Sequence, residues 1–414
     1  MPRGGYLTST TLLETIKREA MVPTSNFALS DADFLAMANQ ELKIGMMPSI
    51  MQYHQEFGVR TDPPIVINAN QSAYEIPYRA VGSKVREVFY LDNNNNICRM
   101  SRINPDAKPY YQQVNNALTF IHYYCEGNSV VLIPSVNETP TGSLVFSYFM
   151  RPNELVDETR VATISNVTTT NSSGNITGIS VAAAAVMTDV AHGLTTGNII
   201  NIQSTNCTPA ISGNYAVTVI DANHFSVPVT TTGSGTTGSW TYTTTIFNVD
   251  QIPSNVVPFG QEGQLISGFS TSSLLDICQT LPGHQTLAYD VLPLAIDSVN
   301  KTITFYTPDL TTYSFSPNVV PAPVAGDYIA FAGECIIPQI PTELHDVLSQ
   351  RVVLRTLQAL GDAQGYGIAQ TKLAEMEKAT GNLIDNRTEG NPIKISNLNG
   401  TLRAVKAFNR ARYY

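Results

Sequence analysis

The hydrophobic period changes twice along this chain, and these changes constrain its fold more than any other feature. From Ser30 to Phe57, apolar residues recur every three or four positions, which predicts helices with one apolar face. From Pro63 to about Leu155 the period is two, which predicts β-strands. A helical period returns after Pro341. Isolated terminal helices are marginally stable, so we expect an α+β fold in which the N- and C-terminal helices pack together beside a β-sandwich or barrel body.

Composition shifts divide the chain further. The stretch from residue 160 to 245 is rich in Thr, Ser, Asn and Gly, which favours disorder, but alternating apolar runs such as Gly213–Val219 favour a compact β-module. We read this stretch as an insertion into the β-domain. The expected parts are an N-terminal helical part (1–60), a first half of the β-domain (61–159), an inserted all-β module (160–245), a second half of the β-domain (246–338), a C-terminal helical part (339–390) and an extended docking tail (391–414).

Local signals mark the expected helix boundaries. Thr11 and Glu14 match a capping box. Ser30 precedes a first turn with two aspartates, which suits the helix dipole. Pro48 lies inside the helical pattern and should kink or split the helix. Thr342 is expected to cap the first C-terminal helix.

The charge content is low and unevenly distributed. Only 14% of the 414 residues are charged, against about 25% in typical soluble domains. Much of the surface is therefore expected to contact other protein chains. The formal net charge is −9, and an acidic body argues against tight binding to nucleic-acid phosphates.

The tail from Asn391 to Tyr414 has the opposite charge. It contains five basic residues and no acidic residue, so the rest of the chain carries a net charge of −14. A basic tail on an acidic body fits docking onto an acidic neighbour, although a disordered, solvated tail fits the charge equally well. The expected docking residues are Lys394, Arg403, Lys406, Phe408, Arg410, Arg412, Tyr413 and Tyr414.

The cysteine spacing and the hydropathy indicate the cellular compartment in which the chain folds. The five cysteines lie far apart without a CxxC pair, which is typical of reduced thiols in a chain folded in a cytoplasm. The N-terminus lacks the apolar run of a signal peptide, and no segment approaches the roughly 18 apolar residues of a membrane span. We expect no membrane span.

Sequence motifs for catalysis or for cofactor and metal binding are weak throughout the chain. The run Gly233–Gly238 matches GxGxxG, but a strand-like segment follows it where a dinucleotide site needs a helix, so we interpret it as a hairpin loop. His192 is interpreted as a turn residue hydrogen-bonded to backbone, and the six histidines lack metal-ligand spacing. We expect no catalytic, cofactor-binding or metal-binding residue, and no enzyme activity.

Two weaker alternatives involve carboxylates and aromatic residues. A pair of carboxylates for acid–base catalysis could come from Asp157, Glu158, Asp327 and Glu334. It is a better explanation that these acids are solvated residues in turns. Trp240 and Tyr242 in the insertion are the only support for sugar binding.

Several segments together resemble a family of head-to-tail adaptors from the neck of tailed bacteriophages. They are Tyr74–Gly82, Leu132–Pro134, Tyr148–Leu155, Val324–Tyr328, Ile337–His345, Gln350–Arg351, Ala359–Asp362 and Leu383–Arg387. The order of these segments and the helix–strand–helix layout carry the resemblance. The patches at His192–Leu194 and Asn214–Phe225 resemble β-modules of phage virion proteins, which independently indicates a virion.

The resemblance implies a homo-oligomeric ring, typically of twelve subunits, below the portal protein and above other neck or tail proteins. Double-stranded DNA would pass through its channel without specific binding, and the tail would dock into the portal. The chain would be made in the bacterial host cytoplasm and would function in the virion neck. The insertion departs from the family pattern and is expected to point outward. The alternatives are a stopper, a tail terminator, a head-decoration protein or a carbohydrate-binding virion component.

Overall fold

The computed structural model describes residues 5–22, 29–53, 57–68, 71–92, 96–109, 122–133, 142–254, 268–281, 283–310 and 322–384. These residues form helices and several β-sheets, so the prediction of a mixed α+β chain is confirmed. In the described ranges, no helix has the length and apolar character needed to cross a membrane. The predicted docking residues of the tail all lie outside the described residues.

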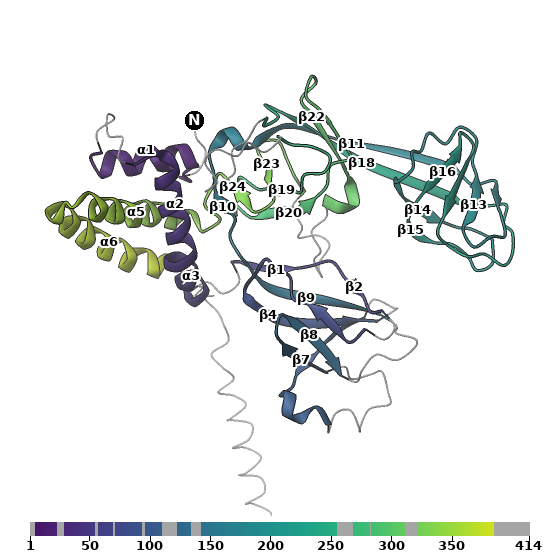
Figure 1. Cartoon of the computed structure of the whole chain (residues 1–414), viewed down its shortest axis with the longest axis horizontal. Coiled ribbons are helices and arrows are strands. Elements are labelled where there is room, and N and C mark those ends of the chain that lie inside the picture. The colour runs from purple at the N-terminus through teal and green to yellow at the C-terminus, as the bar shows by residue number, and fades with distance from the viewer. Residues whose placement is uncertain are drawn as a thin grey trace, which may run out of the picture.

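Helices from both ends of the chain form one helical unit (Figure 1). Its buried core includes Leu12 and Phe34 from the N-terminal helices together with Leu348 and Val352 from the C-terminal part. Its elements are α1 (Ser9–Glu19), α2 (Asp31–Glu41), the π-helix η1 (Leu42–Met46), α3 (Met47–Tyr53), the 3₁₀ turn η5 (Thr342–Leu344), α5 (His345–Leu360) and α6 (Ala363–Ile384).

Ion pairs, centred on the buried carboxylate of Glu41, also join these helices. Glu41 of α2 pairs with Arg351 and Arg355 of α5, and Arg351 also pairs with Glu377 of α6 at 2.5 Å. The salt bridges therefore join three helices around the apolar core.

The helix boundaries confirm some expectations and correct others. Ser30 forms a full capping box with Asp33, and the helical pattern is split before Pro48 by the π-helix. The Thr11–Glu14 box is wrong, because Thr8 is the N-cap and accepts a hydrogen bond from the Thr11 N–H.

The first C-terminal helix begins later than the sequence pattern predicted. Thr342 does not cap α5, since it lies in the 3₁₀ turn that precedes this helix. The break between α5 and α6 lies at Gly361, whose positive φ of 75° glycine adopts without strain. Gly365 and Gly367 lie inside α6.

The first β-body is a sandwich of two sheets around one core, which includes Val88, Leu132 and Phe146. One sheet has the order β1–β9–β4–β5 with β2 beside β9, and the other has the order β3–β8–β7–β6. The elements are β1 (Val59–Thr61), β2 (Ile65–Val66), β3 (Ala73–Glu75), β4 (Ala80–Leu91), β5 (Ile97–Arg99), β6 (Ser101–Arg102), the 3₁₀ turn η2 (Pro105–Ala107), β7 (His122–Glu126), β8 (Ser129–Ile133) and β9 (Ser143–Met150).

The pairing within this sandwich differs from the expectation. We expected Val130–Ile133 and Leu144–Met150 to pair with each other. They lie in β8 and β9, which belong to different sheets. Alternation of apolar and polar residues shows that a strand has one buried face. The same alternation occurs in two strands that pair in one sheet and in two strands that face each other across a sandwich.

A second, central β-body has its own core, which includes Phe247, Leu275 and Phe305. We expected residues 61–159 and 246–338 to be two halves of one β-domain. Most of their buried residues instead belong to two separate clusters, although Leu155 and Val156 of the first range share the helical core with Tyr328 and Cys335 of the second. The elements of the second half are β19 (Leu275–Cys278), β20 (Thr286–Val291), β21 (Ala295–Asp297), β22 (Thr302–Tyr306), the 3₁₀ turn η4 (Thr307–Leu310), β23 (Tyr328–Phe331) and β24 (Glu334–Cys335). The link from the first body consists of β10 (Glu154–Leu155), which pairs in parallel with β24, and the 3₁₀ turn η3 (Glu158–Arg160).

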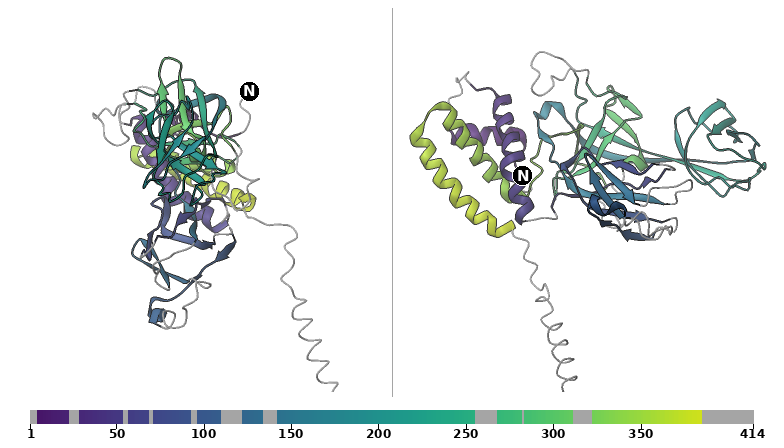
Figure 2. Two further views of the ribbon diagram at one scale, coloured as in Figure 1. Left: turned by 90° about the vertical axis from the view of Figure 1, so that its right-hand side faces the viewer. Right: turned by 60° about the horizontal axis from the view of Figure 1, so that its bottom comes forward.

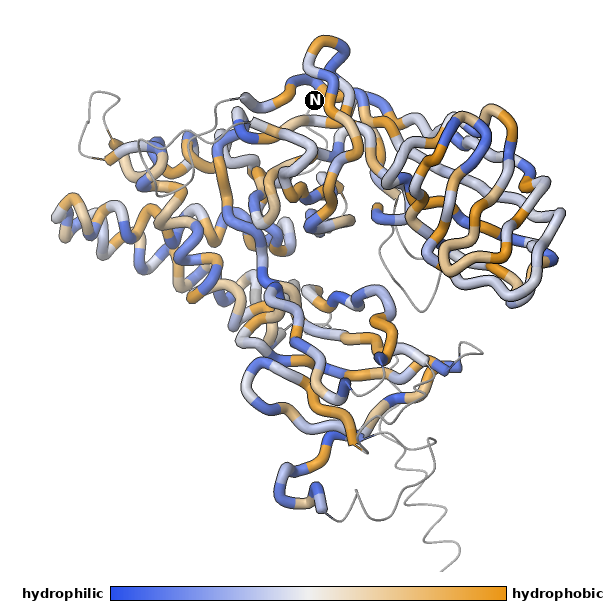
Figure 3. Tube along the Cα trace, turned by 45° about the vertical axis from the view of Figure 1, so that its right-hand side comes forward, coloured by the Kyte–Doolittle hydropathy of each residue, from blue (hydrophilic) through white to orange (hydrophobic). Residues whose placement is uncertain are grey.

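The insertion is joined to the central body by two long antiparallel strands, β11 (Ala162–Asn175) and β18 (Ser239–Val249). Its own core surrounds Trp240 and Phe225, and Figure 3 shows hydrophobic and polar residues alternating along its strands. The strands are β12 (Gly178–Ile179), β13 (Ala185–Thr188), β14 (Ile199–Gln203), β15 (Gly213–Ala216), β16 (Thr218–Asp221) and β17 (His224–Val227). The inserted module and the helical unit lie at opposite ends of the molecule (Figures 1 and 2).

Candidate functional site at the junction of the bodies

The helical unit and the two β-bodies meet at a junction that is built largely from polar side chains. The Arg79 guanidinium of the first β-body bonds to Asp276 of the central body at 2.8 and 2.9 Å and to Asp290 at 2.7 Å. Asn153 bridges the same groups, with its Nδ2 atom 2.8 Å from Asp276 and its Oδ1 atom 3.0 Å from Arg79. Both partners of the main ion pair are buried, so the two β-bodies are held in a fixed relation.

The electrostatics of this network follow from burial and pairing. Burial by itself lowers the pKa of Arg79, but the nearby Asp276 and Asp290 carboxylates outweigh it and raise that pKa. Arg79 is therefore fixed in its charged form. Asp62 is different, because burial raises its pKa although the hydroxyls of Tyr289 and Tyr148 donate hydrogen bonds to it.

A second set of contacts attaches strand β20 to strand β1. Arg60 donates to the carbonyl oxygens of Thr286 at 2.6 Å and Leu287 at 3.1 Å. Gln285 donates through its side chain to the carbonyl of Phe57 at 3.1 Å. The two bonds from Arg60 satisfy backbone carbonyls of β20, which is the edge strand of its sheet within the described ranges.

The histidines at the start of α5 connect the helical unit to this junction. His345 is fully buried, and its Nδ1 atom accepts the Leu7 N–H at 3.0 Å while its Nε2 atom lies 3.3 Å from the Ile340 carbonyl. This arrangement fits the neutral ring with the proton on Nε2. Burial and the neighbouring His284 lower the pKa of His345 to about 4. His284 in turn contacts the Thr342 hydroxyl at 3.1 Å.

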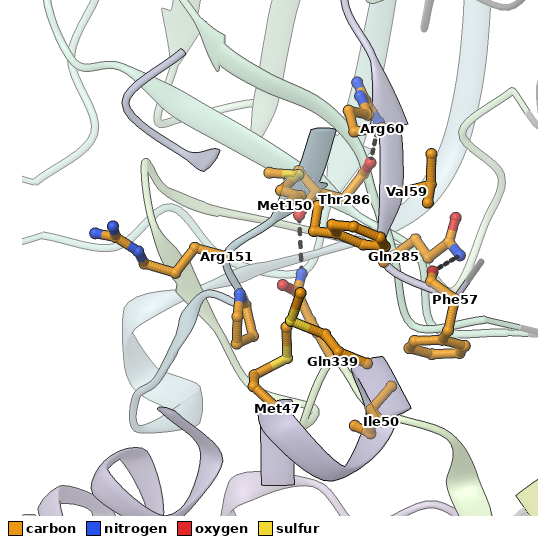
Figure 4. Close-up of a pocket in the computed structure, with 14 residues that line it drawn as sticks. Met47, Ile50, Phe57, Val59, Arg60, Met150, Arg151, Gln285, Thr286 and Gln339 are labelled. Atoms are coloured by element: carbon orange, nitrogen blue, oxygen red, sulfur yellow. Dashed lines mark hydrogen bonds between the residues drawn. The ribbon is translucent and has the colours of Figure 1, made fainter. Parts of the chain in front are cut away.

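An apolar pocket opens where the three bodies meet (Figure 4). Its empty volume is about 590 Å³, including solvent at its mouth. Flexible methionines form much of the wall, and Figure 4 shows Arg151 pointing away from the pocket. The lining residues are Met47, Ile50, Met51, Phe57, Gly58, Val59, Arg60, Phe149, Met150, Arg151, Pro152, Gln285, Thr286 and Gln339. Without an acid, histidine or cysteine in that set, the lining offers apolar contact and hydrogen bonds to a partner rather than acid–base chemistry.

Three of the four candidate carboxylates, Asp157, Asp327 and Glu334, have separate structural partners. Asp157 caps a 3₁₀ turn through the Thr159 N–H, Glu334 pairs with Arg160, and Asp327 accepts from two backbone N–H groups. Each acid therefore already has a structural partner where it lies.

The remaining sequence candidates are also structural. His192 accepts the Leu194 N–H at 2.9 Å and contacts the Asp221 carbonyl, which confirms its interpretation as a turn residue. Gly233–Gly238 leads directly into a strand, β18, and not into a helix, but it is not the hairpin loop that we expected, because the preceding strand β17 pairs with β13 and β16 in a different sheet. Trp240 is only 2% exposed and donates to Asp189, so it has no free face for stacking on a sugar.

Sequence reasoning missed the junction itself. Arg79, Asp276 and Asp290 are far apart in the chain, and a lone Arg within a strand–turn segment gives no signal of its partners. In the described parts of the chain, no group of His, Cys, Asp or Glu residues has metal-site geometry. A comparison with protein-family models and with curated protein sequences finds no match for this chain.

Proposed function

We propose that this chain is a structural virion protein: a subunit of the ring that joins head to tail below the portal in a tailed bacteriophage. One observation carries the proposal furthest. The resemblance rests on segments that are distant in the chain, and three of these segments meet at one place in the fold. Arg79 of the Tyr74–Gly82 segment bonds to Asn153 of the Tyr148–Leu155 segment. The Asn153 N–H in turn donates to Gln339 of the Ile337–His345 segment at 2.8 Å.

The same convergence extends into the helical core. Tyr328, Leu155 and Ile337 come from three of these segments and belong to one buried cluster with the terminal helices. Residues that share a core and a polar network form one coherent structural unit, and matches that converge on such a unit support a shared fold more than scattered matches would. This unit would provide the ring wall and the body of the subunit.

In this proposal the helical unit also positions the docking tail. The last helix, α6, packs beside α5 through Ala369, Leu373 and Met376, and it ends at Ile384 before the basic tail begins. The tail would bind acidic surfaces of the portal through its Lys and Arg residues, with Phe408, Tyr413 and Tyr414 as aromatic anchors. Twelve such subunits would surround a channel through which double-stranded DNA passes without specific binding.

Deleting the chain after Gly390 tests the docking role. We expect the truncated subunit to keep its thermal unfolding transition, since it retains every residue of the described helical core, the last of which is Met376. We also expect it to lose co-assembly with the portal. A matched variant replaces only Phe408, Tyr413 and Tyr414 by serine. It separates the contribution of the aromatic anchors from that of the basic charge. Unchanged portal binding by the truncated subunit would refute the docking arm.

Electron microscopy of the assembled particle tests the location. The proposal expects the chain in a ring between portal and tail, with the inserted module on the outer side. A position on the capsid surface or at the tail tip would instead indicate a decoration or tail-terminator role.

A further inference from the structure

Strand β11 has an outer edge that is occupied at both ends and unpaired between them. Its inner edge pairs with β18 along nearly its whole length. On the outer edge, Ala162 and Thr163 pair with β23 of the central body. At the far end, the Thr177 N–H donates to the Thr188 carbonyl of β13 in the inserted module. From Asn166 to Asn175, none of the residues that the structure describes pairs with this edge.

The register shows which backbone groups point outward. The Ile176 N–H donates to the Gly238 carbonyl, in the same register as the β11–β18 ladder. Successive residues of a strand direct their backbone groups to opposite sides, so the even-numbered residues of β11 bond to β18. The N–H and C=O groups of Val167, Thr169, Asn171 and Ser173 therefore point away from β18.

The hydrogen bonds on the far side of β18 agree with this assignment. The Val249 N–H donates to the Lys301 carbonyl, in the register of the β18–β22 ladder. Odd-numbered residues of β18 thus bond to β22 and even-numbered ones to β11.

The side chains do not protect this edge. Exposed strand edges are commonly protected by lysine, proline or a bulge, because unpaired backbone groups recruit other strands. The ten residues from Asn166 to Asn175 contain no charge and no proline. The one irregularity in the ladder lies between Ile164 and Asn166, before the exposed stretch begins. The open slot from Val167 to Ser173 is roughly 23 Å long.

The filled ends of the slot argue against a second copy of β11 as its occupant. Paired strands lie about 4.8 Å apart, and β11 continues into the central body at one end and into the inserted module at the other. Two such arms side by side would bring the module of one copy against the body of the other. A free extended segment has no such bulk and fits between the two filled positions.

We propose that this slot binds an extended segment of a partner protein, which joins the sheet as an additional strand on β11. Main-chain hydrogen bonds would supply the affinity. The neighbouring side chains are threonine, serine and asparagine, so the matching segment is uncharged and rich in β-branched residues, which form favourable cross-strand pairs with threonine. The inference goes beyond the connector function and does not depend on it.

Amide hydrogen exchange on the full chain tests the proposal, with the peptide acetyl-Thr-Val-Thr-Val-Thr-Val-Thr-amide as the probe. Without peptide, the amides of Thr168, Thr170 and Ser172 should exchange slowly, whereas those of Thr169 and Asn171 should exchange fast. About 1 mM peptide should slow the fast set by roughly tenfold and leave the slow set unchanged.

Two substitutions at one position separate backbone pairing from side-chain contact. Asn171→Pro removes an outward N–H without removing a bond to β18, so it should abolish the peptide effect, whereas Asn171→Thr should keep it. If the proline unfolds the arm, a Thr169→Lys/Asn171→Lys variant keeps every N–H and should also block pairing. The proposal is overturned if the peptide protects no outward amide, or if those amides become protected without peptide as the chain concentration rises, which would make a second copy the occupant.

Discussion

The Arg79 guanidinium and the Asp276 carboxylate form a two-pronged ion pair between two separate β-bodies, with N–O distances of 2.8 and 2.9 Å and side-chain exposures of 5% and 0%. The bodies on either side have separate apolar cores. Their relation therefore depends on a buried polar contact, and such contacts demand a defined geometry because an unpaired buried charge is costly.

Replacing Arg79 tests this dependence. Arg79→Met leaves Asp276 buried without its cation, and we expect a loss of about 3–5 kcal/mol in unfolding free energy, measured by urea titration. The double variant Arg79→Met/Asp276→Leu should recover much of the loss. A matched change at the half-exposed Lys43–Glu154 pair, Lys43→Met, should cost less than about 1 kcal/mol. Equal losses at the two sites would contradict the structural role of Arg79.

Acid should destabilise the chain through His345. Its folded pKa is lowered to about 4, below the unfolded value of about 6.5, so the unfolded state binds more protons between these values and stability falls as the pH drops through that window. At pH 5 the expected loss from this group is about 2 kcal/mol relative to pH 7.5.

The readout of this pH effect is urea unfolding followed by circular dichroism, and two variants make it specific. His345→Asn cannot gain the proton and should lose most of the pH dependence. His224→Asn, at an exposed pair with Asp221, should keep it. A parent chain equally stable at pH 5 and pH 7.5 would show that His345 is protonated in the folded state.

The single tryptophan allows the inserted module to be followed separately. A Cβ atom at Gly174 would lie 2.0 Å from Asp189 Oδ2 and 2.6 Å from Trp240 Nε1, so Gly174→Ala should disrupt the hydrogen bond between those groups. We expect the fluorescence transition to move to lower urea, by about 1–3 kcal/mol in unfolding free energy. Ser173→Ala, at the exposed neighbouring residue, should leave the transition unchanged.

The chain should not hold duplex DNA through its body. Residues 1–390 carry a net charge of −14, and an acidic surface repels phosphates. We therefore expect the truncated subunit to leave the fluorescence anisotropy of a labelled duplex unchanged at about 150 mM salt. Salt-dependent binding by the truncated subunit would contradict a non-binding channel wall, and binding only by the full chain would assign it to the basic tail.

Much of the local structure follows from the residues alone. The capping box at Ser30, the split before Pro48, the turn at His192 and the folded β-character of the insertion each arise from contacts within a short stretch of chain. Short-range hydrogen bonds and periodicity encode such features directly.

Short-range hydrogen bonds and periodicity did not show which distant strands pair with each other. Alternation placed β8 and β9 correctly as strands but could not show that they lie in different sheets. It also could not show that the first and the central β-body have separate cores, because a period of two reports one buried face and not what covers it.

By itself, the sequence determined the α+β class, the helical ends, the β-rich middle and the acidic body with its basic tail, because composition and periodicity are local properties. Only the tertiary structure decided that Arg79 meets Asp276 and Asn153, that Trp240 is buried, and that β11 keeps an open edge between two filled positions. Those features depend on residues that are far apart in the chain, 74 residues for Arg79 and Asn153 and 197 for Arg79 and Asp276, or on which strand pairs with which. Burial and hydrogen-bond satisfaction across the whole fold select them.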